Sequence, residues 1–431
     1  MEGKLTKLEK YWILYDVGNS AFVLLVSTIL PIYFNYLAGN GGVSEVDALA
    51  YWGYAASIST LLVALIGPVL GTVADTEGYK KPIFTACMTL GVLGCAALAL
   101  PVSWLAFLVI FVVAKVGYSS SLIFYDAMLS DVTSPERMDQ VSSQGYAWGY
   151  IGSCIPFIIS LVFVLGNEVI GLSMPAAMAI AFLVNAGWWF LVTVPLLKTY
   201  QQKHGVPRKE HVIRESFGRL KRVMGDIRGH RKIFLFLLAF FFYIDGVYTI
   251  IEMATAYGSA IGLDSQGLLL ALLVTQIVAF PCALFFGKAA KKYQNTTLIK
   301  FCIACYFCIA LFAIQLDKQW EFWFLAVCVG MFQGGIQALS RSYFAKIIPP
   351  ERSGEFFGIF DICGKGASFL GTALVGFMTQ LTQNPSTGVG MLAVLFGIGF
   401  VIFGMATKDE KREKAKQIFL VSDGLAKNPE I

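Results

Sequence analysis

Long apolar stretches, separated by short polar connections, dominate the hydrophobic pattern of this chain of 431 residues. Each stretch reaches roughly the 18–20 residues that a helix needs to cross the hydrocarbon core of a bilayer. Because backbone polar groups must be satisfied internally in that core, repeated stretches of this length predict a bundle of transmembrane helices. Twelve of them can be placed, at residues 11–37, 48–73, 82–100, 104–130, 142–166, 174–197, 233–258, 267–290, 298–316, 322–348, 356–381 and 388–406.

The chain repeats a short motif at half its length. Pro135-Glu136-Arg137 recurs as Pro350-Glu351-Arg352, 215 positions later. Self-similarity at a fixed offset indicates duplicated structural units. The prediction is an all-α polytopic membrane protein of two pseudo-symmetric six-helix bundles. Its parts are the bundles at 1–197 and 233–406, a basic cytoplasmic linker at 198–232 and a cytoplasmic tail at 407–431.

Composition and charge fix the expected orientation. Hydrophobic residues make up 57% of the chain and charged residues 14%, against about 25% charged in soluble domains. Lys and Arg gather in loops on the side of the two termini, whereas the opposite loops carry Glu168, Asp264 and a single lysine, Lys318. By the positive-inside rule, both termini are expected in the cytoplasm. The net charge of +5 is therefore a topology signal, and no nucleic-acid partner is expected.

Charged residues inside the apolar segments follow a pattern. Each costs roughly 2.5–3.5 kcal/mol at a helix centre, so none should face lipid. They occupy segments 1, 4, 7, 10 and 11, and segments 3, 6, 9 and 12 have none, which indicates three-helix units within each half. Segments 1, 4, 7 and 10 should then line a common polar interior. The residues are Asp16, Lys115, Asp126, Asp245, Glu252, Arg341, Asp361 and Lys365.

The loop after the second segment carries a recognisable motif, Gly71-x-x-x-Asp75-x-x-Gly78-x-Lys80-Lys81. With the threefold arrangement, it resembles the hallmark loop of the major facilitator superfamily, although Thr76 stands where that loop usually has a basic residue. The resemblance implies that Asp75 caps the start of segment 11, near Glu355, and latches one conformation. Alternatively, Lys80 and Lys81 serve only the positive-inside rule. In the second half Lys291 lies near the position equivalent to Asp75, so this latch is not expected twice.

A narrower resemblance covers nearly the whole chain. The stretches YDVGNSAF (15–22), YIDGVYTIIEMATAYGSAIGL (243–263), GGIQALSRSYFAKIIPPER (334–352) and EFFGIFDICGK (355–365) are similar to the vacuole-effluxer family of autophagy-related permeases and their bacterial relatives. The fungal members are associated with amino-acid export. Val17 and Gly18 depart from the usual pattern of an aromatic residue and Ala. The short loops and compact length suggest a bacterial member in the plasma membrane.

The intramembrane charges suggest a site for a small zwitterionic solute. At 1.5 Å per helical residue, Lys115, Asp245 and Lys365 come out near the bilayer midplane, where transporters of this kind bind substrate. Glu252 lies on the same face as Asp245. A cation could hold the carboxylate of such a solute, and an acid its ammonium group. Additional hydrogen bonds are expected from Asn19, Gln333 and Gln337.

Two aspects of that site stay open. Asp361 and Lys365, four residues apart, could simply neutralise each other. Desolvated carboxylates bind protons more tightly, so any of Asp16, Asp245 and Glu252 could carry a coupled proton.

The half-length offset also predicts an inner gate. It aligns Asp126 with Arg341 and Asp131 with Lys346, which places acids of one half opposite bases of the other near the cytoplasmic mouth. These residues could meet when that mouth closes. Local pairing with Glu136 or Glu351 at the helix ends is the alternative.

Other functions are weighed against transport of a zwitterion. Proton-coupled efflux of amphipathic drugs is the nearest alternative, and a solute sensor or lipid scramblase could use the same fold. An enzyme, a metal or a cofactor is not expected, because the three histidines lie in the linker and the cysteines in apolar segments. The linker could be an amphipathic helix on the inner leaflet or a solvated connection. The expected partners are a small solute, lipid and, with coupling, protons, bound by a monomer.

Overall fold

The computed structural model describes residues 4–208 and 230–427, and helices account for all the regular structure of these ranges except one isolated bridge. The sequence interpretation of 209–229 as an amphipathic helix or a solvated connection lies outside the described residues.

The first half contains α1 (Lys7–Ser27), α2 (Ile29–Asn40), α3 (Glu45–Ala74), α4 (Lys80–Ala97), α5 (Trp104–Ala127), α6 (Leu129–Val132), α7 (Met138–Leu165), α8 (Asn167–Ile170) and α9 (Met174–Thr199). The second contains α11 (Arg231–Ala260), α12 (Ser265–Ala289), α13 (Asn295–Ala313), α14 (Gln319–Ile347), η1 (Pro350–Arg352), α15 (Ser353–Thr382) and α16 (Pro385–Lys427).

Each of the predicted apolar segments coincides with a helix or, for the first, with the pair α1 and α2. Thr28 separates that pair, and its hydroxyl donates to the carbonyl of Leu24 at 2.5 Å. Within the described residues, ten helical stretches are long and apolar enough to cross a membrane. The all-helical fold class is thus confirmed, while the inside location of the termini stays a prediction.

Local capping explains where several helices begin. Thr6 and Glu9 form a capping box at α1, in which each side chain accepts a hydrogen bond from the other residue's backbone amide. A single side-chain oxygen caps other helices in the same way and satisfies an otherwise orphaned amide. The capping residues are Ser44, Ser103, Ser173 and Asp264.

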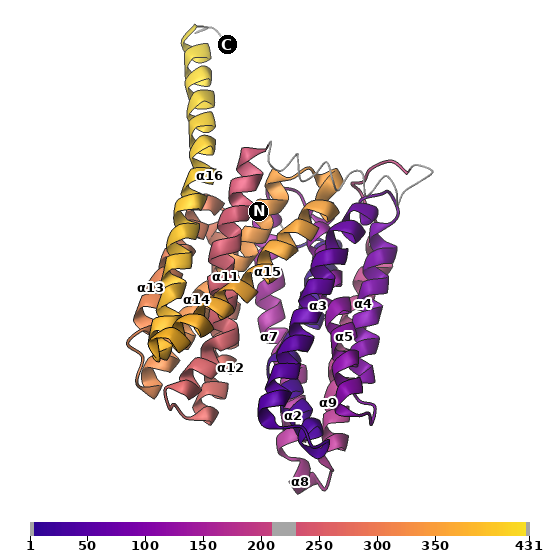
Figure 1. Cartoon of the computed structure of the whole chain (residues 1–431). Helices are drawn as coiled ribbons and strands as arrows, with labels where there is room; N and C mark the ends of the chain where they lie inside the picture. The colour runs from indigo at the N-terminus through magenta and orange to yellow at the C-terminus, as the bar shows by residue number, and fades with distance from the viewer. Residues whose placement is uncertain (1–3, 209–229, 428–431) are drawn as a thin grey trace.

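The two halves of the chain form two bundles that lie side by side (Figure 1). They meet along two seams, α3 against α15 and α7 against α12. On the first seam Gly71 and Gly354 approach so closely that a Cβ on either would overlap the carbonyl oxygen of the other. Small residues therefore allow the helix backbones of the two halves to touch.

Helix faces turned away from the seams are apolar and exposed. Leu61 and Leu65 on α3 and Leu93 on α4 are each 60% exposed or more. In a bilayer these faces meet lipid tails, which solvate them without cost. We call the end of the bundle where α3 ends and α15 begins the cytoplasmic end, following the orientation predicted from the basic loops.

Candidate functional site

Arg341 of α14 links the two halves near the cytoplasmic end. Its guanidinium donates to Asp126 at 3.0 Å, to Asp16 at 3.3 Å and to the hydroxyl of Ser142 at 2.9 Å. All three acceptors belong to the first half, and only 2% of the arginine side chain is exposed. Asp126 and Arg341, which the repeat aligns, are therefore in direct contact.

Aromatic rings of the first half enclose the same guanidinium. Its central carbon lies 4.7 Å from the ring centre of Trp12 and 4.3 Å from that of Tyr146. Tyr125 stacks on Trp12 and donates its hydroxyl to Asp16 at 2.8 Å. Cation–π contact and charged hydrogen bonds together satisfy a cation that would otherwise be costly to bury. No sequence pattern identifies these rings, since no spacing rule connects Trp12 or Tyr146 to a residue 329 or 195 positions away.

The predicted pairing of Asp131 with Lys346 is wrong. Lys346 instead contacts Asp139, at 2.5 Å, in the first turn of α7. Asp131 lies in the short helix α6 and pairs with Lys80 of its own half, at 3.3 Å. The repeat aligns backbone positions, but the turn made by α6 buries Asp131 among the loops of the first half.

Asp139 of α7 joins the first half to α13 and α14 of the second half. Besides Lys346 it accepts hydrogen bonds from Asn295 at 2.5 Å and from Ser342 at 2.6 Å. Under the half-length offset, Asn295 corresponds to Lys80 and Lys346 to Asp131. The contact made by Asp75 is not copied in the second half, yet the equivalent junction has its own acid–base cluster. Asp139 lies two residues after the end of the repeated Pro-Glu-Arg motif, and that is the signal that could have identified it.

Asp75 sits where the motif places it, at the start of α15. Its two carboxylate oxygens accept the backbone amides of Gly354 at 2.7 Å and Glu355 at 2.9 Å. These amides belong to the first turn of the helix, where free N–H groups and the macrodipole favour an anion. Gly78 has a φ of +81°, as the tight turn requires. Lys81, in contrast, lies with Thr85, Thr89 and Leu93 on the outer face of α4.

Acidification is expected to favour this latched arrangement. Burial raises the pKa of Asp75 to about 7, although Lys80 and the two helix amides favour its charged form. A hydrated Asp75 in an opened latch would titrate near the ordinary value of about 3.9. The latched state binds the proton more tightly, so it gains stability as the pH falls through about 7 and loses it as the pH rises.

Pulsed-EPR distances between spin labels on the ends of α3 and α15, in a cysteine-free background, would measure this effect. The short-distance population should grow between about pH 8 and about pH 5.5. Asp75→Asn carries no titratable group there and should give a flat profile. An equal slope in both proteins would assign the effect to another residue.

Asp245 of α11 is fully buried and makes an unusual contact. One carboxylate oxygen accepts both the hydroxyl of Thr249, at 3.2 Å, and the backbone amide of Gly371 in α15, at 2.9 Å. The other oxygen has no hydrogen-bond partner among the described residues. A Cβ on Gly371 would overlap both Asp245 and Thr249, so the approach requires glycine. An unpaired buried carboxylate oxygen is costly unless it binds a proton or a ligand.

Lys115 and Glu252 are oppositely charged residues of the two different halves. Lys115 of α5 is partly exposed, Glu252 of α11 is exposed, and they are close enough for a Coulomb interaction. Lys365 belongs to α15, but its side chain lies outside the described ones, so its pairing with Asp361 stays an open prediction.

The three predicted amide side chains differ in their surroundings. Asn19 donates to the carbonyl of Tyr15, at 2.7 Å, within α1. Gln337 accepts the hydroxyl of Tyr150 from the other half, at 3.2 Å. Gln333 has a buried carbonyl oxygen without a partner in the described part of the chain, and it lines a cavity of about 90 Å³ inside the second half.

Comparison with known proteins gives consistent matches. The family model described as "Vacuole effluxer Atg22 like" matches residues 6–136 and 130–416. The uncharacterized MFS-type transporter YxiO of Bacillus subtilis (strain 168) is 43% identical over 422 residues, which cover 97% of this chain and 99% of the relative. Autophagy-related protein 22 of Coccidioides immitis (strain RS) is 21% identical, over 88% of this chain and 76% of its own.

Solved structures share the fold at low identity. The major facilitator superfamily transporter FucP in the outward conformation has a TM-score of 0.71 and 12% identity, covering 93% of this chain and 98% of its own. A bacterial homologue of the iron transporter ferroportin in the outward-facing state has a TM-score of 0.68 and 13% identity, over the same shares of both chains.

Proposed function

Because this chain belongs to the vacuole-effluxer Atg22-like family of major facilitator superfamily transporters, we propose that it carries a small zwitterionic, amino-acid-like solute by alternating access. The observation that carries the proposal is the Coulomb interaction between Lys115 of the first half and Glu252 of the second. A zwitterion can replace both partners at once, its carboxylate on Lys115 and its ammonium group on Glu252 or Asp245. Such a solute then contacts both halves and can couple their movement.

The distribution of contacts supports an outward-facing state. Arg341, Asp75 and Asp139 each join the halves at the cytoplasmic end. Glu252, farther toward the opposite end of α11, is exposed. Solute would enter from outside here, and its release inside would require the cytoplasmic contacts to open. Asp16, Asp126 and Arg341 form the main part of this proposed gate.

We assign Asp245 as the first candidate for a coupled proton, because its free carboxylate oxygen offers a proton-binding position next to α15. Asp16 is the weaker candidate, since it already accepts from Arg341 and Tyr125. Glu252 is better suited to contact solute, because it is exposed. By analogy with the bacterial relative, we place the protein in the plasma membrane.

A thermal-shift screen of purified protein tests the substrate class. Amino acids that stabilise the protein by mass action should lose the effect as methyl esters, which lack the carboxylate, and as N-acetyl derivatives, which lack the ammonium group. Stabilisation by amphipathic cations alone would favour drug efflux instead. An ester that stabilises as well as its parent amino acid would contradict the role of Lys115.

A further inference from the structure

The start of the interdomain linker is docked on the latch loop of the first half. After α9 ends, the amide of Val206 donates to the carbonyl of Asp75 at 2.7 Å, and the amide of Glu77 donates to the carbonyl of Val206 at 3.1 Å. These bonds form the isolated parallel bridge between Thr76 and Val206. The latch loop, residues 75–80, is therefore bound by a second segment from more than 100 positions away.

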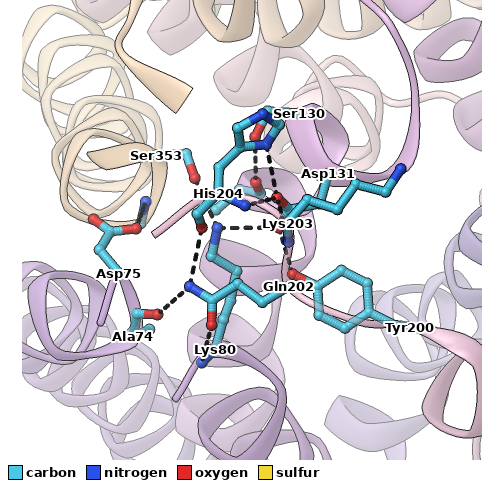
Figure 2. Close-up of polar contacts among 12 residues, drawn as sticks. Ala74, Asp75, Lys80, Ser130, Asp131, Tyr200, Gln202, Lys203, His204 and Ser353 are labelled. Carbon is cyan, nitrogen blue, oxygen red and sulfur yellow. Dashed lines mark hydrogen bonds and ion pairs between the residues drawn. The ribbon is translucent and has the colours of Figure 1, made fainter. Parts of the chain in front are cut away.

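Gln202 makes the densest set of contacts in this segment. Its side-chain oxygen accepts the amides of Gly78, at 3.0 Å, and Lys80, at 3.3 Å. Its side-chain nitrogen donates to the carbonyl of Ala74, at 3.3 Å, and to that of His204, at 3.1 Å. One side chain thus fixes both ends of the turn that carries Asp75 (Figure 2).

Asp131 binds the same segment and connects it with Lys80. Its carboxylate accepts the hydroxyl of Tyr200 at 2.5 Å, the amide of His204 at 2.9 Å and the His204 ring at 3.0 Å. It also binds the ammonium group of Lys80, at 3.3 Å. Figure 2 shows these bonds converging on Asp131, which is buried. The carboxylate oxygens are shared between the linker and the latch lysine.

Asp75 and Lys80 of the latch loop both form hydrogen bonds with the second half. Lys80 donates to the hydroxyl of Ser353 at 2.9 Å, and Asp75 accepts the amides of Gly354 and Glu355. We propose that residues 200–206 are a brace, a third component that holds Asp75 and Lys80 in the position in which they close the cytoplasmic end. The proposal rests on the alternating-access function above.

The length of the linker distinguishes a brace, which orders the latch loop, from a tether, which would limit how far the two halves can separate. Residues 207–230 could span roughly 80 Å when extended, about eight times the spacing of packed helix axes, so the linker does not limit the separation of the halves by its length. What the start of the linker contributes is local order. Its hydrogen bonds satisfy backbone groups of the latch loop that would otherwise be free to change conformation.

Hydrogen–deuterium exchange of the purified, substrate-free protein tests the brace. Gln202→Ala should accelerate exchange in a peptide covering residues 353–358 about tenfold, the effect of losing roughly one net hydrogen bond's worth of latch stability. The exposed neighbour Gln201 provides the matched control, and Gln201→Ala should exchange like the natural protein. Equal exchange in the two variants would overturn the proposal.

A second variant covers the case in which Gln202→Ala fails to fold. Gln202→Met keeps most of the side-chain volume but loses all four hydrogen bonds, so it should accelerate exchange to a similar extent. A protease site inserted between 209 and 229 distinguishes the brace from a tether. If residues 200–206 act as a brace, cutting the linker should leave exchange in residues 353–358 unchanged. Faster exchange after cutting would contradict the brace. Since no substrate is present, failure here is independent of failure of the substrate assignment.

Discussion

Arg341→Ala is expected to abolish transport and to shift the protein away from the cytoplasmically closed state. The substitution leaves Asp16 and Asp126 buried without their cation. Removing one partner of a buried ion pair costs about 3–5 kcal/mol. A cost of that size moves a two-state equilibrium by roughly 150–5000-fold. Solute uptake by proteoliposomes and spin-label distances across the cytoplasmic ends of α5 and α14 would measure the two effects.

Arg137 supplies the matched control for Arg341. It binds Glu9 at 2.7 Å, but both residues belong to the first half, so Arg137→Ala should cost stability without changing the distances between the halves. If the two variants show the same distance distribution, Arg341 is not part of a gate.

The reversed pair Asp126→Arg with Arg341→Asp should recover only part of the activity. A carboxylate in place of Arg341 would face Asp16 as well, and it could not occupy the position between Trp12 and Tyr146. No recovery at all beyond the single variants would contradict a direct role of this pair in closure.

Asp245→Asn is expected to reduce transport about 100-fold while leaving the fold intact, the size of effect that loss of a charged hydrogen bond and its proton or ligand produces. Folding should survive because Thr249 and Gly371 both donate to one carboxylate oxygen. In Asp245→Asn, the oxygen of the side-chain amide group would accept the same two hydrogen bonds, and the amide nitrogen would then occupy the position of the unpaired carboxylate oxygen. Uptake with and without an imposed pH gradient would separate loss of binding from loss of coupling.

Asp264 offers the same chemical change outside the site. It caps α12 by accepting the amide of Gly267 at 2.7 Å and lies in an outer loop. Asp264→Asn should retain transport and its pH dependence. Normal pH-driven uptake by Asp245→Asn would remove Asp245 from the proton route and leave Asp16 and Glu252 as candidates.

Much of the latch could be predicted from sequence because it depends on a loop. Gly71, Asp75 and Gly78 are fixed relative to one another by a short turn, so their motif already implies the cap on α15. Of the two charge pairs expected in the gate, only one could be predicted from the sequence. The repeat brought Asp126 to Arg341, but it misassigned Lys346, whose partner Asp139 lies eight positions from Asp131.

The sequence by itself determined the helical membrane fold, the division into two halves and the motif family, because hydrophobic length, repeat offset and turn chemistry are properties of neighbouring residues. Only the tertiary structure decided which charges meet. Each residue turns a helix by about 100°, and a break as short as α6 redirects whatever follows it. The ring enclosure of Arg341, the cluster at Asp139 and the docking of Gln202 on the latch loop therefore required the packed halves. The residues in these contacts come from separate helices, and no local sequence pattern determines how those helices are rotated relative to one another.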